Sequence, residues 1–197
     1  MNGAWVTFRK ELLTYCVSPV SWVIAVVFYL LRGYELTGVT QAFAYLHGDP
    51  DLFASATYSR SSTFLMVMFV PGLLTMRCFA EERRTGSMEM LMTAPVRDGG
   101  VVVGKWAAAT AFYALVWLPS AVLLHVLEYG PFLDTDLAFG PVIAAYLGMF
   151  LLSSMLIAFG CFASSLTDNV LLAALLSFVF DFGLMTLPQQ LSATLGD

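Results

Sequence analysis

Long apolar runs separated by short polar intervals make up most of this 197-residue chain. About 20 consecutive apolar residues are enough for an α-helix to cross the ~30 Å hydrocarbon core of a bilayer. The pattern therefore predicts an all-α polytopic membrane protein with five membrane-spanning helices in one domain over residues 1–197. We expect these spans at residues 19–34, 61–79, 101–127, 137–163 and 170–187.

Residues 3–16, before the first span, have the pattern of an amphipathic helix that lies along the membrane surface. Apolar residues recur there at spacings of three and four, and polar residues fall on the opposite side. The apolar set is Trp5, Phe8, Leu12 and Tyr15, and the polar set is Thr7, Lys10, Glu11 and Thr14. The alternative is a plain extension of the first span. Ser18-Pro19 favours a new helix start, because serine caps helices and proline suits their first position.

Polar and proline residues interrupt the remaining pattern. Residues 35–58 are predicted to form a polar loop, and Arg32 before them is expected to snorkel toward the headgroups. Pro71 lies within the second span, where neighbouring helices can satisfy the freed carbonyl. We expect a break or bend near Pro119 in the third span, and a polar tail from Pro188 onward.

Composition and charge support a membrane protein and suggest its orientation. The chain is 59% hydrophobic and 12% charged, whereas soluble domains have about 25% charged residues. A cytoplasmic N-terminus places most of the nine Lys and Arg residues on the cytoplasmic side and leaves Arg32 and Arg60 outside. We therefore expect a multi-pass protein of a bacterial-type inner membrane. No basic face of the kind that binds nucleic acid is present.

Motifs of catalysis and cofactor binding are weak or absent. Cys16, Cys78 and Cys161 have no CxxC spacing and are interpreted as membrane-buried thiols. Residues 99–105, GGVVVGK, fit the front of a phosphate-binding loop, but Trp106 stands where Ser or Thr would hold Mg²⁺. We interpret that match as accidental. We expect no ATP, other cofactor, metal or catalytic site on this chain.

The longest charged interval is residues 79–95, FAEERRTGSMEMLMTAP, which we call the charged stretch. The helical spacing of Arg77, Glu81 and Arg84 predicts that the second span continues beyond the membrane surface. Gly86 is expected to interrupt that helix. A second short helix over residues 87–93 follows, with a Met-rich face suited to docking in a groove of a soluble partner. The alternative is an ordinary loop whose charges are solvated.

Asp181 is the most conspicuous polar residue within an apolar run. Charged side chains in a bilayer are costly, and they usually face a bundle interior or a water-filled path. The functional interpretation places Asp181 on a substrate route or at a subunit interface. The alternative is that the fifth span is short and that Asp181 lies near the headgroups or is protonated.

The stretch TMRCFAEERRTGSMEMLMTAPVRDGGVVVGKW resembles the permease subunits of ABC type-2 exporters, especially the gliding-motility-type branch. FRKELLTYCVSP near the N-terminus is similar to the interfacial elbow helix of that family. The segment from Glu82 to Gly86 matches its E-x-x-x-G spacing, and Gly104-Lys105 opens the third span. The resemblance covers essentially the whole chain.

This resemblance implies a six-span permease that pairs with a second permease, the same or different, above two cytoplasmic ATPases. ATP and Mg²⁺ would be bound by those ATPases, and a coupling helix over residues 87–93 would dock on them. The chain shows five spans, so we expect it to be C-terminally incomplete or shortened. The implied ATPase-coupling residues are Glu82, Arg83, Arg84, Gly86, Ser87, Met88, Glu89, Leu91 and Met92.

Two functional hypotheses follow. The first is a permease subunit of an ATP-driven exporter that couples to a separate ATPase through the charged stretch. The second is a non-transporting membrane scaffold or assembly component of a surface or gliding-motility complex. A neighbouring gene for an ATPase with a complete phosphate loop would favour the first hypothesis.

Overall fold

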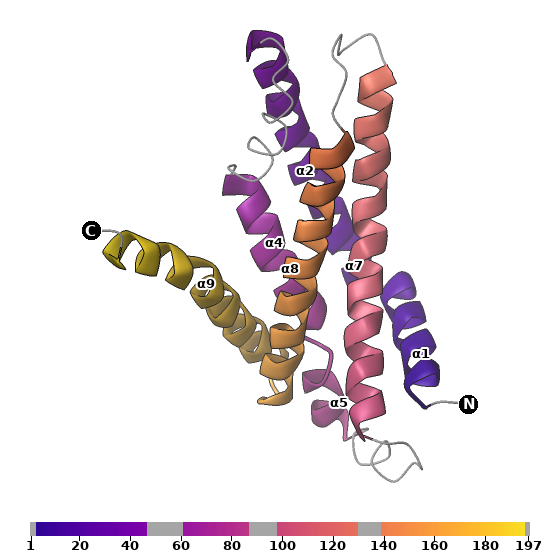
Figure 1. Cartoon of the computed structure of the whole chain (residues 1–197). Helices are drawn as coiled ribbons and strands as arrows, with labels where there is room; N and C mark the ends of the chain where they lie inside the picture. The colour runs from indigo at the N-terminus through magenta and orange to yellow at the C-terminus, as the bar shows by residue number, and fades with distance from the viewer. Residues whose placement is uncertain (1–2, 47–60, 87–97, 130–138, 196–197) are drawn as a thin grey trace.

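The computed structural model describes residues 3–46, 61–86, 98–129 and 139–195, and these residues form a helical bundle (Figure 1). The expected all-α class is confirmed, because the described chain contains no strand. The elements are α1 (Gly3–Val17), α2 (Pro19–Leu46), α4 (Ser61–Thr75), α5 (Ala80–Thr85), α7 (Asp98–Tyr129), α8 (Phe139–Ser165) and α9 (Val170–Leu195).

Several helices extend beyond the apolar runs that predicted them. α2 continues to Leu46, so the loop predicted from residue 35 is wrong over its first part. α7 runs through Pro119 without a break, and α9 runs through Pro188 to Leu195. An apolar run shows where a helix can face lipid, whereas its backbone hydrogen bonds continue as long as neighbouring residues permit. A proline removes one such bond without ending a helix in a bundle.

The second span does not continue as one helix. α4 ends at Thr75, residues 76–79 form a turn, and α5 begins at Ala80. The predicted continuous helix is therefore wrong, but Gly86 does end α5, as expected. Its φ of 72° lies in the left-handed region, which glycine adopts without steric cost. The predicted coupling helix at residues 87–93 lies outside the described residues.

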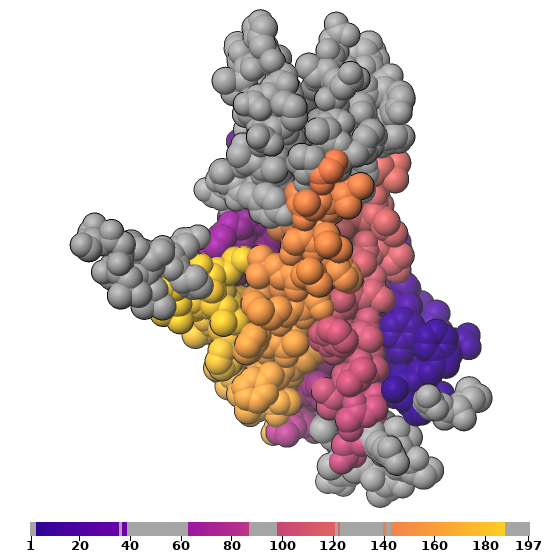
Figure 2. Space-filling model, viewed as in Figure 1, coloured from indigo at the N-terminus to yellow at the C-terminus, as the bar shows by residue number. Residues whose placement is uncertain are grey.

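α1 is a separate helix that bends by 66° from the first part of α2. The predicted N-terminal helix is confirmed, and a straight extension of the first span is excluded. Figure 2 shows α1 against the lower part of α7. A Cβ added at Gly104 would lie 2.8 Å from the Ala4 carbonyl oxygen, so glycine permits this close approach. The predicted division of α1 into an apolar face and a polar, solvent-facing side is wrong for Glu11. Its side chain points toward the bundle, where it accepts a hydrogen bond from Lys105.

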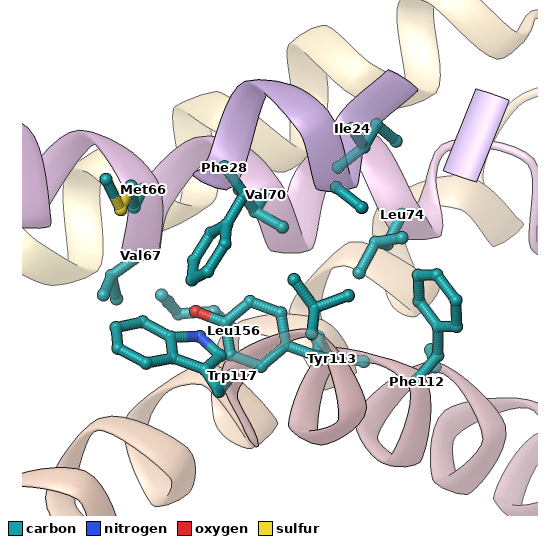
Figure 3. Close-up of a cluster of buried hydrophobic side chains, with 14 of the residues drawn as sticks. Ile24, Phe28, Met66, Val67, Val70, Leu74, Phe112, Tyr113, Trp117 and Leu156 are labelled. Carbon is teal, nitrogen blue, oxygen red and sulfur yellow. The ribbon is translucent and has the colours of Figure 1, made fainter. Parts of the chain in front are cut away.

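The core lies where α2, α4, α7 and α8 meet (Figure 3). Phe28 of α2 packs edge-on against Trp117 of α7, with ring centroids 5.0 Å apart. Tyr113 is almost fully buried, and its hydroxyl accepts a hydrogen bond from Ser153 of α8 at 3.0 Å. Aromatic pairs of this geometry add to the burial of apolar area. The core therefore fixes four helices against one another.

Small residues bring α4, α8 and α9 together. A Cβ at Gly160 of α8 would collide with the Thr75 hydroxyl of α4 and lie 3.0 Å from the Ser177 hydroxyl of α9. A Cβ at Gly72 of α4 would lie 2.8 Å from the Phe178 ring. Such contacts are typical of helix packing within membranes.

Four candidate membrane spans occur among the described residues, or five if the bent pair of α1 and the first part of α2 counts as one. Many large apolar side chains on their outer faces are exposed, as lipid-facing side chains are in a membrane protein. The four are Thr63–Thr85, Asp98–Ser120, Ile143–Ser165 and Val170–Leu187.

Candidate functional site

A buried lysine joins three segments at the end of the bundle that holds α5, which is the lower end in Figure 1. The Nζ of Lys105 on α7 donates hydrogen bonds to Glu82 Oε1 of α5 at 2.9 Å and to Glu11 Oε1 of α1 at 3.0 Å. It also donates to the Cys78 carbonyl oxygen at 2.9 Å. The Lys105 side chain is only 2% exposed. We call these four residues the Lys105 junction.

The geometry of the junction explains how a lysine can be buried there. An ammonium group has three N–H donors, and the three acceptors of Lys105 match that number. Two carboxylates more than offset its single positive charge, and the ring of Phe79 lies 5.3 Å from Nζ. A buried charge without such partners would be strongly destabilising. The junction therefore holds α1, α5 and α7 in one arrangement.

Ser164, near the end of α8, fixes the start of α5. Its Oγ accepts hydrogen bonds from the backbone N–H groups of Phe79 and Ala80 at 3.0 and 3.1 Å, and it donates to the Met76 carbonyl oxygen at 3.2 Å. The N-cap residue Phe79 offers no side-chain cap of its own. Ser164 thus performs from another helix the capping that serine usually performs locally.

The predicted coupling residues are only partly brought together. Glu82 lies in the Lys105 junction, and Arg83 pairs with Asp168 beyond α8 at 3.8 Å. Arg84 and Gly86 are exposed. The remaining predicted residues lie outside the described part of the chain, and they are Ser87, Met88, Glu89, Leu91 and Met92.

The glycine-rich match at residues 99–105 is helical within α7, and Lys105 is held by carboxylates. It does not form a loop around a phosphate site. The thiols of Cys78 and Cys161 are buried 3.7 Å apart, as expected for membrane-buried cysteines, and Cys16 is partly buried.

A second buried charge pair lies farther along the bundle, between α2 and its neighbours. Arg32 Nη1 donates to Glu35 Oε2 at 2.8 Å, and Thr63 of α4 donates to Glu35 Oε1 at 2.6 Å. Arg32 also reaches the Tyr146 hydroxyl of α8 at 3.4 Å and lies over the Trp117 ring. The prediction that Arg32 snorkels to the headgroups is therefore wrong: the guanidinium finds its partners inside the bundle.

Asp181 is fully buried in α9, eleven residues or about 16 Å from the first residue of the helix. The 26-residue helix contains a candidate span of 18 residues, Val170–Leu187, and Asp181 lies within that span. Neither carboxyl oxygen meets hydrogen-bond geometry with a described residue, although the buried Ser177 hydroxyl one turn earlier interacts with the carboxyl group. Buried ionisable groups of this kind in a membrane usually have a function.

Sequence reasoning named Glu82, Gly86 and Asp181 as candidates, but it missed the partners of Lys105 and the charge pair in α2. Glu11 and Lys105 are 94 positions apart, so no helical spacing connects them. Arg32 and Glu35 have helix-type spacing, and that signal could have extended the first helix beyond residue 34.

Comparison with known proteins shows the family to which the chain belongs. Residues 34–195 match the family described as ABC-2 family transporter protein. Neither the curated proteins nor the solved structures include a match to the chain. The matched region includes the C-terminal part of α2, from residue 34 onward, and all of α4, α5, α7, α8 and α9. The chain therefore belongs to the ABC-2 transporter family and is a membrane permease component of an ABC transporter.

Proposed function

We propose that this permease is part of an ATP-driven exporter of the inner membrane and that the charged stretch couples it to a separate cytoplasmic ATPase. In this proposal, residues 87–93 dock on the ATPase, which holds ATP and Mg²⁺. A second permease copy, the same or different, completes the membrane part, and by resemblance the exporter is of the gliding-motility type. The chain itself performs no chemical step.

The Lys105 junction is the observation that carries this proposal. α5 is held at its first residues by Ser164 of α8 and at Glu82 by Lys105 of α7. A displacement at the C-terminal end of α5 is therefore transmitted to α7 and, through Glu11, to α1. A turn at residues 76–79 separates α5 from α4. The proposed coupling thus acts through the contacts of α5 with Ser164 and Lys105 and through the turn that precedes α5.

Gly86 contributes to the proposed coupling through its backbone conformation. Its positive φ sets the direction in which the chain leaves α5. Proline has a fixed φ near −65° and cannot adopt that conformation. Replacement by proline should therefore redirect the segment that leads to the proposed docking helix without touching the Lys105 junction.

The experiment compares co-purification with the ATPase of the neighbouring gene for the wild type, for Glu82→Ala with Gly86→Pro, and for Glu81→Ala. Glu81 is the matched control, because it is half-exposed and pairs only loosely with Arg77 at 3.9 Å. We expect the double variant to retain much less ATPase and the control to retain a wild-type amount.

Equal retention of the ATPase by all three proteins would contradict the coupling role of this segment. Failure of the wild type to retain any ATPase would instead favour the second hypothesis, a non-transporting scaffold. Gly86→Pro alone, assayed for ATPase stimulation, separates an altered docking direction from loss of the Glu82 contact.

A further inference from the structure

A charged cavity of about 360 Å³ lies between α1, the start of α2, the end of α4 and α5. Its wall has equal numbers of basic and acidic side chains. The basic ones are Lys10, Arg77 and Lys105, and the acidic ones are Glu11, Glu81 and Glu82. A ligand that enters this cavity must therefore satisfy charges of both signs.

An apolar groove of about 590 Å³ runs between α2 and α4. Val20, Ile24 and Leu73 line both the groove and the charged cavity, so the two hollows are joined end to end. The groove contains apolar side chains alone, and it follows α2 from Val20 to Leu31. These eleven steps span about 16 Å, which is about half of the ~30 Å hydrocarbon core. Its length therefore corresponds to one leaflet of a bilayer.

The charges at the rim of the cavity are available to a ligand. Lys105 is saturated by its three acceptors, but Lys10 is 66% exposed and lies 3.9 Å from Glu11. Arg77 is 47% exposed, and its Nε lies 3.9 Å from Glu81. Exposed pairs at such distances contribute little stability. A ligand phosphate can therefore replace the Glu81 carboxylate as the partner of Arg77. The ammonium of the same ligand can then pair with Glu81.

From this juxtaposition we propose that the joined cavity and groove bind one phospholipid whose headgroup contains a phosphate and a primary ammonium, as in phosphatidylethanolamine. The phosphate lies between Lys10 and Arg77, the ammonium lies at Glu81, and an acyl chain fills the groove. A primary ammonium donates three hydrogen bonds, whereas a choline headgroup donates none. A glycerol headgroup places no cation beside Glu81. The site requires no nucleotide.

The test uses the whole chain, delipidated in detergent and titrated with phosphatidylethanolamine, phosphatidylcholine and phosphatidylglycerol of identical acyl chains while native mass spectrometry counts bound lipid. Phosphoethanolamine alone tests whether the headgroup suffices. We expect one saturable phosphatidylethanolamine, bound about tenfold more tightly than either other lipid, which corresponds to about 1.4 kcal/mol. The free headgroup should bind much more weakly, because it leaves the groove empty.

Matched variants test the charged rim and the apolar groove separately. Arg77→Gln and Lys10→Gln should each weaken phosphatidylethanolamine severalfold, whereas Arg9→Gln, an exposed charge outside the cavity, should not. Val27→Phe obstructs the groove and should weaken all three lipids, whereas Val102→Phe on the exposed face of α7 should weaken none. Both valines are about half exposed, so neither change disturbs the core.

Glu81→Gln has a separate prediction, because it should reduce the preference for phosphatidylethanolamine over phosphatidylglycerol. Equal binding of the three lipids, unaffected by these variants, would overturn the proposal in favour of non-specific surface lipid. Disulfide formation between two copies of a Val27→Cys variant, with no saturable lipid, would also overturn it, because a second permease would then cover the groove.

Discussion

At the scale of single residues, Lys105 makes the sharpest prediction about stability. Lys105→Met removes one charge from a buried cluster and leaves Glu11 and Glu82 facing each other. We expect a loss of about 3–5 kcal/mol in the free energy of unfolding, as when one partner of a buried ion pair is removed. Unfolding in mixed micelles, followed by tryptophan fluorescence, measures the effect.

Arg83→Met is the control for that measurement. Arg83 pairs with Asp168 at 3.8 Å, and both side chains are well exposed. An exposed pair contributes about 0–1 kcal/mol, so the control should unfold almost like the wild type. Equal effects of the two variants would show that the Lys105 junction does not stabilise the fold.

Asp181 gives a prediction in which stability and transport change in opposite directions. A buried polar group without a full set of hydrogen bonds costs about 1–3 kcal/mol. Asp181→Leu should therefore raise the unfolding free energy by about that amount, while transport falls. Asp181→Asn should impair transport more than assembly. Wild-type transport by Asp181→Asn would contradict a functional role, and destabilisation by Asp181→Leu would reveal a stabilising partner for the carboxyl group.

At the scale of helices, the crossing of α4, α8 and α9 depends on glycine. Gly160→Ala places a methyl group against Thr75 and Ser177, so α8 must move away from α4 and α9. We expect a loss of about 1–3 kcal/mol, as is typical of overpacking. Gly183→Ala is the matched control, because its added Cβ meets nothing within 4 Å. That variant should gain up to about 1 kcal/mol from helix propensity. Thermal unfolding of both variants decides whether close packing or helix propensity dominates.

The helices were predictable from the apolar runs, but their ends were not. Each predicted span corresponds to a helix, because burial in lipid requires an apolar face over its whole length. The polar continuation of α2 beyond Tyr34 was missed because Glu35 is paired inside the bundle with Arg32 and Thr63. The turn after Thr75 was missed because Ser164, which satisfies the freed N–H groups, is distant in the sequence.

The candidate site was predictable only to the extent that its signals are local. Glu82 and Gly86 stood out through their spacing and through the special backbone conformation that glycine permits. The contact of Lys105 with Glu11 depends on how α1 packs against α7. Helical periodicity placed Glu11 on the solvent side of α1, because periodicity alone cannot reveal a buried cation on another helix.

At the scale of the whole molecule, buried charge clusters connect the helices at two levels of the bundle. The Lys105 junction joins α1, α5 and α7. The cluster of Arg32 and Glu35 joins α2 to α4 and α8. The apolar core lies where these helices meet (Figure 3). Such buried pairs contribute less to stability than their attraction suggests, but they define which helices move together. We therefore expect α1, α5 and α7 to respond as one unit.

Gly104→Ala tests this unit without removing any charge. The added Cβ would lie 2.8 Å from the Ala4 carbonyl oxygen and 3.0 Å from Thr7 Cβ, so α1 must shift away from α7. We expect the bond between Lys105 and Glu11 to lengthen, with a loss of about 1–3 kcal/mol in the free energy of unfolding. Spin labels on α1 and α7 measure the displacement.

If α1, α5 and α7 form one coupled unit, the same variant should also lower ATP-driven transport severalfold, although neither carboxylate nor the lysine has changed. Gly99→Ala, in the first turn of α7, is the control because its Cβ would meet nothing within 4 Å. A displaced α1 with unchanged transport would restrict the coupling to α5 and α7, where the bond between Glu82 and Lys105 persists. Reduced transport with an undisplaced α1 would contradict the mechanism, because the effect would then arise from α7 alone.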